Sequence, residues 1–369
     1  MKNPWNHEVL GPSMRLGTMV VVVAILAWFE AGSTRLAQAS VQQEIAPDGS
    51  KLRIWGSRHK EQPFDADQVV EQLESLAYSP VALLADGSLT CFRTYGLICL
   101  DVPEGVGVPG RRIVKIAAGS GHVVALLEDG SVAAWGSNFN GQCDVPDGLG
   151  TLENPVVEVA AGGAQSGVRR RDGSIVRWGT TDWDMGEVPA DLGSPARPVA
   201  QLVSGRWHSL ALLVDGSVVG WGFNPNGQCD VPSGVGTPEN PIRSLAAGGM
   251  HSVALLADGS IVCWGMNEHG QCDVPDGIGT PEKPVVSVAA GDYHTVVLLG
   301  DGTVVCWGKN RDGQCHVPFD VGTAAYPASK ICAGANSTSV VYRKAPEKAP
   351  EPEVPEDPKP AEDPKTPAA

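Results

Sequence analysis

The sequence predicts an all-β protein, a seven-bladed β-propeller of about 43-residue repeats whose ring is closed by a blade shared between the two ends of the chain. Three observations predict it: an aromatic residue at a fixed interval, a tight turn inside each repeat, and two complementary half-repeats. The composition agrees, because 45 Gly and 29 Pro among 369 residues favour short strands and turns over long helices.

The aromatic residues are spaced 43 positions apart, and all but the first precede a glycine: Phe92, Trp135, Trp178, Trp221, Trp264 and Trp307. A fixed period of this size is typical of one supersecondary unit repeated in tandem. Each unit is too small to bury its own apolar face, so the units must pack against one another.

One repeat can be divided into four candidate strands. Three of them are runs of apolar and β-forming residues, at 284–290, 294–299 and 303–307. Asp301-Gly302 lies between the second and third runs and is typical of a tight hairpin, because both positions of such a turn favour φ > 0. A further turn is expected to lead into a short fourth strand that ends at Val317-Pro318.

The two ends of the repeat region each hold half a repeat. Residues 330–342 contain the first two strands but no following Asp-Gly turn or Trp-Gly strand, and residues 48–56 supply that missing half. Joined together they form one blade, which gives seven blades with the six whole repeats. The joint also removes the exposed sheet edges that a linear array would carry, which favours a closed ring.

The N-terminus has the order of a signal peptide, predicted to span residues 1–39 with a short lead-in at 40–45. Lys2 and Arg15 precede an apolar stretch at 19–29, and Ala37-Gln38-Ala39 offers a small-residue cleavage site. The apolar stretch is short for a membrane span, so the mature chain is expected to have none. An uncleaved anchor is the alternative. Either way the protein is expected to be secreted or to lie in the periplasm or cell envelope.

The propeller is predicted at 46–343, and residues 344–369 are predicted to be a disordered tail. The tail alternates Pro with Ala, Glu, Asp and Lys and has no aromatic residue, so it cannot bury enough apolar area to fold. The formal charge of the whole chain is −15. This argues against nucleic acid as a partner, because a phosphate binder needs a positively charged surface.

The repeat closely resembles that of the regulator of chromosome condensation family over about residues 46–343. The matching residues in one unit are 246–256, then Asp258-Gly259-Ser260, Trp264-Gly265 and Gly270-Gln271. Two blades depart from the pattern, with Leu76-Ala77-Tyr78-Ser79 in blade one and Gln165 in place of a recurring His in blade three.

The resemblance implies a seven-bladed propeller and two contrasting functions. The best-known eukaryotic member is a nucleotide exchange factor on chromatin, and an exported, acidic chain without a long insertion argues against that activity. The secreted bacterial branch that includes β-lactamase-inhibitor propellers is similar in location and short loops, and in phrases such as Gly227-Gln228 followed by Val231-Pro232. Fold alone does not fix the function.

Residues that could carry chemistry have ordinary structural interpretations. His122, His208, His251 and His294 recur once per repeat, so they should lie on separate blades, bonded to backbone groups, rather than form a zinc site. The Asp-Gly pairs lack the spacing of calcium loops. No cofactor or metal is therefore expected. Asp182, Trp183 and Asp184 break the repeat and are the one candidate acid/base set, the alternative that would make this protein an enzyme.

Six of the nine cysteines are paired by position across the turn after a third strand, where an antiparallel return can bring them to disulfide distance. The expected pairs are Cys263 with Cys272, Cys306 with Cys315, and Cys91 with Cys99. Export makes disulfides more plausible than buried thiols.

The residue before each recurring His varies while its neighbours stay fixed, and it is expected in a tight loop at the ring's mouth. Aromatic residues, Met and Arg anchor protein interfaces. The predicted partner-binding residues are therefore Tyr78, Arg206, Trp207, Met250, Asp292 and Tyr293. The alternative is that these side chains fill the central channel, in which case a partner should bind the opposite face, near residues 223–226.

The sequence thus favours an exported, monomeric, non-catalytic platform that binds a protein through one mouth of the ring. One alternative is a lyase- or hydrolase-like enzyme acting on an extracellular glycan or peptide. Weaker alternatives are a nucleotide-exchange-type regulator and a structural component of the envelope.

Overall fold

The computed structural model describes residues 50–56, 64–65, 69–77, 79–91, 101–150, 153–180 and 186–345. All of them belong to one compact unit that begins at Ile45. They contain 22 strands and no helix, and hence no helix long and apolar enough to span a membrane. The predicted signal peptide, the lead-in and all but the first two residues of the tail lie outside the described residues, so these boundaries stay predictions.

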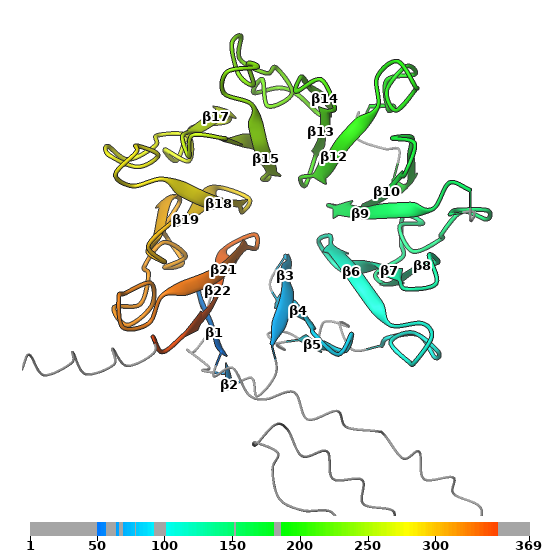
Figure 1. Ribbon diagram of the computed structural model, residues 1–369, viewed down its shortest axis with the longest axis horizontal. Coiled ribbons are helices and arrows are strands. Elements are labelled where there is room, and N and C mark those ends of the chain that lie inside the picture. Colours follow the sequence, from blue (N-terminus) through cyan, green and yellow to red (C-terminus); the bar gives the residue numbers. More distant parts are fainter. Residues whose placement is uncertain are drawn as a thin grey trace, which may run out of the picture. The chain divides into compact units, whose positions relative to one another are not determined.

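Seven separate sheets surround a central channel (Figure 1), which confirms the predicted fold class. In the six blades that consist of one continuous segment, the strand that comes first in sequence lies innermost. Blades one to three consist of β3 (Val70–Leu76), β4 (Ser79–Leu84) and β5 (Leu89–Cys91); β6 (Ile113–Ala118), β7 (His122–Leu127) and β8 (Val132–Gly136); and β9 (Val156–Gly162), β10 (Gln165–Arg170) and β11 (Ile175–Gly179).

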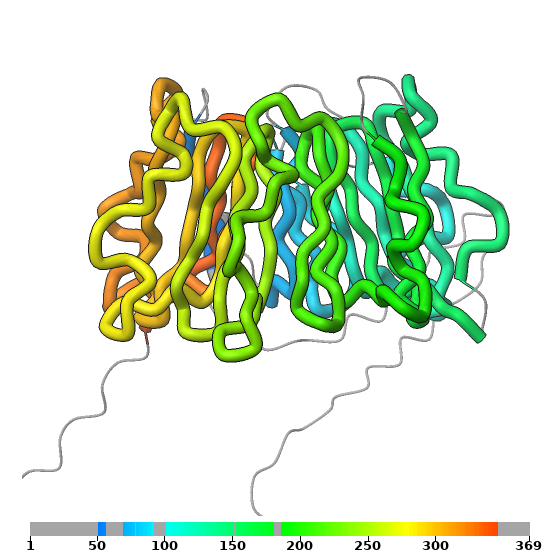
Figure 2. The backbone as a smooth tube through the Cα atoms, turned by 90° about the horizontal axis from the view of Figure 1, so that it is seen from above, coloured from blue at the N-terminus to red at the C-terminus, as the bar shows by residue number. Residues whose placement is uncertain are grey.

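Blades four to six repeat the same order of three strands. They consist of β12 (Val199–Ser204), β13 (His208–Leu213) and β14 (Val218–Gly222); β15 (Ile242–Ala247), β16 (His251–Leu256) and β17 (Ile261–Gly265); and β18 (Val285–Ala290), β19 (His294–Leu299) and β20 (Val304–Gly308). Figure 2 shows that the strands run between two faces of the ring, where the loops gather.

The apolar core lies between neighbouring blades. All six residues of β16 are buried, because one side of the strand packs on the preceding blade and the other on the following blade. One apolar cluster occupies each of the seven interfaces; between blades four and five, Leu210 of β13 packs with Leu245 and Trp264. A blade therefore cannot bury its apolar residues without both neighbours.

The hairpins form at the predicted Asp-Gly positions, but Asp and Gly are not the two central residues of the turn. In blade five the Gly259 amide donates to the Leu256 carbonyl at 3.1 Å, so Ala257 and Asp258 are central and Gly259 follows them. Gly259 has φ of 86°, a conformation that favours glycine. The Asp258 carboxylate accepts hydrogen bonds from the Ser260 amide at 2.9 Å and the Ser260 hydroxyl at 2.6 Å, which closes the turn. The same Asp-to-Ser bonds recur in other blades.

The predicted fourth strand of each repeat is wrong for the six blades that consist of one continuous segment, since their described residues form three-stranded sheets. The reason is that side chains take up the backbone groups that a ladder would need. In blade six Asn310 Oδ1 accepts the Cys315 amide at 2.9 Å, and Gln314 Oε1 accepts the Asp312 amide at 3.0 Å. The segment therefore folds into local turns on the outer side of the blade.

Blade seven is built from both ends of the chain, as predicted. β21 (Ala328–Ala333) and β22 (Ser337–Arg343) come from the C-terminal side, β1 (Ser50–Gly56) pairs with β22 over seven residues, and β2 (Phe64–Asp65) lies outermost. Leu52 and Ile54 of β1 also pack against Val70 and Leu73 of blade one. The ring is thus closed by seven antiparallel residue pairs.

Deleting residues 330–343 should open the ring, because β1 would lose its partner and two blade interfaces would lose one side. We expect unfolding in urea to become broad and non-cooperative and the protein to self-associate, as measured by circular dichroism and analytical ultracentrifugation. A chain that ends at Ala345 is the control and should unfold as sharply as the full chain. A sharp transition in the 330–343 deletion would contradict closure by the shared blade.

Candidate functional site

The described residues of the predicted binding site, Arg206, Trp207, Met250, Asp292 and Tyr293, lie in loops that join the first and second strands of their blades. We call this side of the ring the mouth face. His208 begins the second strand of blade four and pairs with Gly222 at the end of the third, so the loop after the third strand lies on the same face. The expectation that residues 223–226 lie on the opposite face was therefore wrong. In an antiparallel pair the start of one strand lies beside the end of the other, so the loops at these two ends lie on the same face.

Arg206 and Asp292 are brought together by the structure. Arg206 Nη1 lies 2.5 Å from Asp292 Oδ2, although the two residues belong to blades four and six. The ion pair spans the loop of blade five at Gly249, where a Cβ atom would approach the Asp292 carbonyl oxygen to 2.6 Å. The Arg206 guanidinium also lies 5.3 Å from the Trp207 ring centre, within range of a cation–π contact.

Met250 and Tyr293 occupy the loops that correspond to that of Trp207, and all three side chains are half-buried. Lys309 Nζ lies 4.9 Å from the Tyr293 ring centre, and His269 meets the same ring edge-on at 5.4 Å. Asn226 Nδ2 approaches Met250 Sδ at 3.5 Å. Met250 and Tyr293 are thus each flanked by a residue from a loop that follows a third strand.

Sequence reasoning missed Phe223, Met266, Lys309 and His269 on this face. The amide of Phe223 donates to the Trp207 carbonyl at 3.0 Å, and the amides of Met266 and Lys309 donate to the equivalent carbonyls at 2.8 and 2.9 Å. The signal was present, because the residue after each Trp-Gly also varies inside a fixed frame: Ser137, Thr180, Phe223, Met266 and Lys309.

Several sequence predictions fall outside the described residues. Tyr78, the blade-one member of the predicted site, is one of them. The candidate acid/base set at Asp182, Trp183 and Asp184 is another, and Cys99 is a third. Their predicted roles stay predictions.

The central channel contains a cavity of about 340 Å³ near the mouth face. Arg206 and Asp292 line it, whereas Trp207, Met250 and Tyr293 do not. The alternative that these three side chains fill the channel therefore has no support in the described residues. They lie outside the channel and are only half-buried.

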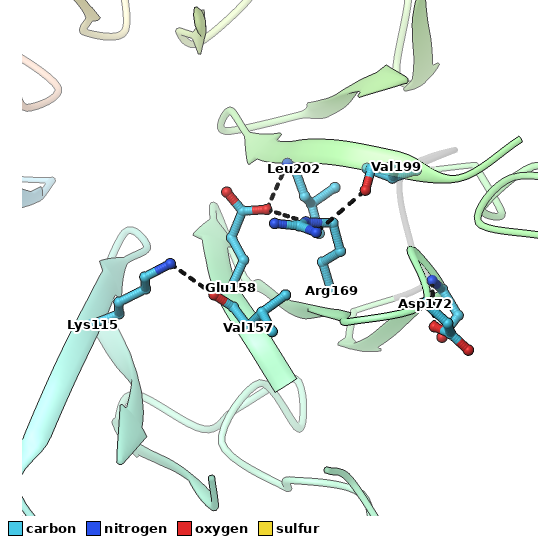
Figure 3. Close-up of polar contacts among 8 residues, drawn as sticks. Lys115, Val157, Glu158, Arg169, Asp172, Val199 and Leu202 are labelled. Carbon is cyan, nitrogen blue, oxygen red and sulfur yellow. Dashed lines mark hydrogen bonds and ion pairs between the residues drawn. The ribbon is translucent and has the colours of Figure 1, made fainter. Parts of the chain in front are cut away.

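Polar side chains bridge neighbouring inner strands deeper in the channel (Figure 3). Glu158 of β9 accepts the Leu202 amide of the next blade at 3.1 Å and pairs with Arg169 at 2.7 Å. Lys115 Nζ donates to the Val157 carbonyl at 2.7 Å. These bonds hold the inner strands of blades two, three and four together.

The four recurring histidines are structural, but their partners differ from the prediction. Each Nε2 lies 2.9–3.2 Å from a Ser or Thr hydroxyl of the next blade rather than being held only by backbone groups. The Nε2 of His122 also lies 3.1 Å from the Gln165 carbonyl oxygen. The hydroxyl of Thr295, which meets His251, donates to the Gln271 carbonyl at 2.8 Å, and Trp307 Nε1 donates to the same oxygen at 3.0 Å. We call this set of bonds the interblade relay.

Burial keeps these histidines neutral. It lowers the pKa of His122, His208 and His294 to about 4 and that of His251 to about 3. They lie on different blades, and nowhere in the described parts of the chain do three His, Cys, Asp or Glu side chains come close enough to hold a metal ion.

Two of the predicted cysteine pairs are in contact. The Sγ atoms of Cys263 and Cys272 lie 2.6 Å apart, and those of Cys306 and Cys315 lie 2.7 Å apart. The contact between the sulfur atoms, together with burial, raises the pKa of the Cys263 thiol. Gly220 stands where the partner of Cys229 would be, and burial raises the pKa of the Cys229 thiol to about 11.

Four of the repeats match a known family model. Residues 113–142, 199–228, 242–271 and 285–314 match the profile described as Regulator of chromosome condensation (RCC1) repeat. No curated protein sequence matches the chain.

Solved structures share the fold. Prp20p of Saccharomyces cerevisiae, described with its binding properties to Gsp1p and histones, has a TM-score of 0.63 at 20% identity, covering 81% of this chain and 92% of its own. Yeast RCC1 (Prp20) bound to Kap60 gives 0.64 at 18% identity, covering 90% and 97%. Human WBSCR16 gives 0.61 at 17% identity, covering 80% and 99%.

The interblade relay predicts that stability falls as the pH is lowered from about 6.5 to about 4. The folded chain keeps these histidines neutral, whereas the unfolded chain binds protons near pH 6.5, so acid favours unfolding. A shift from 6.5 to about 4 corresponds to roughly 3 kcal/mol for one histidine as an upper bound. Urea unfolding at pH 7.5 and 4.5 measures the loss.

His251→Gln tests the assignment, because Gln already occupies this position in blade three as Gln165. We expect the difference in unfolding free energy between the two pH values to shrink. His316→Gln, at an exposed position, is the control and should leave that difference unchanged. An equal pH dependence in His251→Gln and the native chain would show that this histidine does not contribute.

Proposed function

We propose that this chain, a propeller built from regulator of chromosome condensation repeats, is an exported, non-catalytic platform that binds a protein partner at its mouth face. The observation that carries the proposal is the arrangement of Trp207, Met250 and Tyr293 in equivalent loops of three consecutive blades, half-buried and outside the channel. We call these three residues with Phe223 and Met266 the mouth arc.

The composition of the mouth arc is that of an interface anchor. Aromatic residues and Met supply large apolar contact area, and Arg is enriched beside them in protein interfaces. Arg206 is already oriented by Asp292 and by the Trp207 ring, and Lys309 by the Tyr293 ring. Binding then requires little further ordering of these long side chains.

Solved neighbours support protein binding by this fold in general. Prp20p is described with its binding to Gsp1p and histones, and yeast RCC1 is described bound to Kap60. Their identity to this chain is 18–20%, so those partners do not transfer. The net charge of −15 also makes a chromatin partner unsuitable here.

Export is supported by the signal-peptide order of the N-terminus and by the paired cysteines. We propose that the contacting pairs Cys263–Cys272 and Cys306–Cys315 are disulfides in the exported protein, and that Cys91–Cys99 forms a third. We also propose that the protein is a monomer and that residues 344–369 are a disordered tail.

Mass spectrometry of non-reduced protein recovered from the cell envelope or medium should show peptides linked through Cys263–Cys272 and Cys306–Cys315. Cys229 is the internal control and should be alkylated without reductant. Each short loop should contribute about 2–3 kcal/mol, so the reduced protein should melt at a lower temperature. Full alkylation of all nine cysteines without reductant would rule out both the disulfides and this argument for export.

Trp207→Ala should weaken binding of the partner by at least about thirtyfold, since truncating a central interface aromatic commonly costs about 2 kcal/mol or more. The melting temperature should stay nearly unchanged, because the side chain is only half-buried. Crosslinking and pull-down with the mature ring identify proteins that the variant loses, and calorimetry with the purified partner gives the dissociation constant.

Phe319→Ala is the matched control, because Phe319 is an aromatic residue that is 94% exposed in the loop leading into β21. This variant should bind as the native ring does. The proposal fails if Trp207→Ala retains native affinity. A melting temperature lowered by several degrees with intact binding would instead make Trp207 a packing residue.

A further inference from the structure

Glu74 is a carboxylate in a ring of small apolar residues. It lies on β3 opposite Val81, and the same register position on the other inner strands is occupied by Ala117, Ala160, Val203, Ala246, Ala289 and Cys332. A small apolar side chain therefore satisfies the fold at this position in six of the seven blades. The carboxylate of blade one is not required for blade packing.

Glu74 faces the channel. It lines the cavity of about 340 Å³ near the mouth and also an adjoining cavity of about 370 Å³. The mouth cavity is lined as well by Ser75, Ser204 and Gln201, whose oxygen atoms can accept hydrogen bonds. The space suits an unbranched chain that ends in a hydrogen-bond donor.

The other charged residues that line the two cavities have partners. Arg206 pairs with Asp292 at 2.5 Å, and Glu158 pairs with Arg169 at 2.7 Å. Lys115 donates to the Val157 carbonyl. In the described part of the chain, Glu74 accepts a hydrogen bond from Gln72 Nε2 at 2.8 Å and has no cation within ion-pair distance.

A half-buried carboxylate without a cation is disfavoured in its charged form. Burial raises the pKa of Glu74 to about 7, despite the hydrogen bond from Gln72. Near neutral pH a cation bound in the cavity would therefore favour loss of the Glu74 proton and would form an ion pair with the carboxylate.

We infer that the channel binds one cationic group, a primary ammonium or a guanidinium, with Glu74 as its counter-ion. The ammonium would donate to the Glu74 carboxylate, and its alkyl chain would extend toward the mouth. Such a group comes from a free small amine or from a Lys or Arg side chain that a protein partner inserts. The second source rests on the proposed function, whereas the first does not.

The experiment titrates the mature ring with n-butylammonium chloride by calorimetry at pH 8.5 and pH 5.5. The ligand stays protonated at both values, while Glu74 is ionised mainly at the higher one. We expect binding at least about tenfold tighter at pH 8.5 and its loss in Glu74→Gln. Glu71→Gln, at an exposed position on the same strand, is the control and should bind as the native ring does. Equal binding by Glu74→Gln, or none by the native ring, would overturn the inference.

Glu74→Ala separates this role from a structural one. It introduces the residue that blades two, three, five and six carry, so the melting temperature of this variant at pH 8.5 should be equal to or above that of the native ring. A clearly lower melting temperature would assign Glu74 to packing and overturn the inference. Trp207→Ala should leave n-butylammonium binding unchanged, so failure of the proposed function is detected separately.

The two sources of the cation are distinguished with the partner bound at the mouth arc. If the partner inserts a Lys or Arg side chain, Glu74→Gln should lower its affinity, and n-butylammonium should compete with it. If the ligand is a free amine, the affinity of the partner should not change in Glu74→Gln. In either case the n-butylammonium titration decides whether the cation site exists.

Discussion

One carbonyl oxygen at each of four blade interfaces accepts two hydrogen bonds from the following blade. Between blades five and six the acceptor is Gln271, and the donors are the Trp307 indole and the Thr295 hydroxyl, which also meets His251. Neighbouring blades share no strand pairing, so this relay and the apolar cluster beneath it fix how one blade sits on the next. At these four interfaces the Gln, the Ser or Thr, the Trp and the His of the relay return at the same spacing, in agreement with the 43-residue period of the sequence.

The relay leaves other positions free to vary. The carbonyl of Trp207 accepts the Phe223 amide, and that bond requires only backbone atoms. The frame around it is fixed by His208 and Gly222, so the side chains of Trp207 and Phe223 can change without disturbing the blade. Variable side chains on a rigid frame are the usual arrangement of a binding surface, because the scaffold supplies the stability and the loops supply the specificity. The mouth arc follows that arrangement on three adjacent blades.

The ring, its seven blades and its closure could be predicted because each depends on a local pattern repeated many times. The fourth strand could not, because Asn310 and Gln314 look like ordinary turn residues until their side chains are seen to occupy the backbone groups of the segment. The variable residue before each His could be identified from the sequence. The variable residue after each Trp-Gly was missed, because only the pairing of the second and third strands brings it next to the first. The ion pair of Arg206 with Asp292 also skips a blade, and no spacing rule predicts such a contact.

The interior of the ring disfavours charge, and this single property acts on its titratable groups in opposite directions. The interblade histidines are held neutral by a lowered pKa, whereas the pKa of Glu74 is raised to about 7. Where a charge is retained inside, it has a partner, as Glu158 has in Arg169. Glu74 has no such partner among the described residues, and alanine occupies its position in four other blades. The carboxylate is therefore a departure from the repeat that the fold does not need. Departures of this kind, rather than the repeated residues, are where a propeller can acquire a ligand of its own.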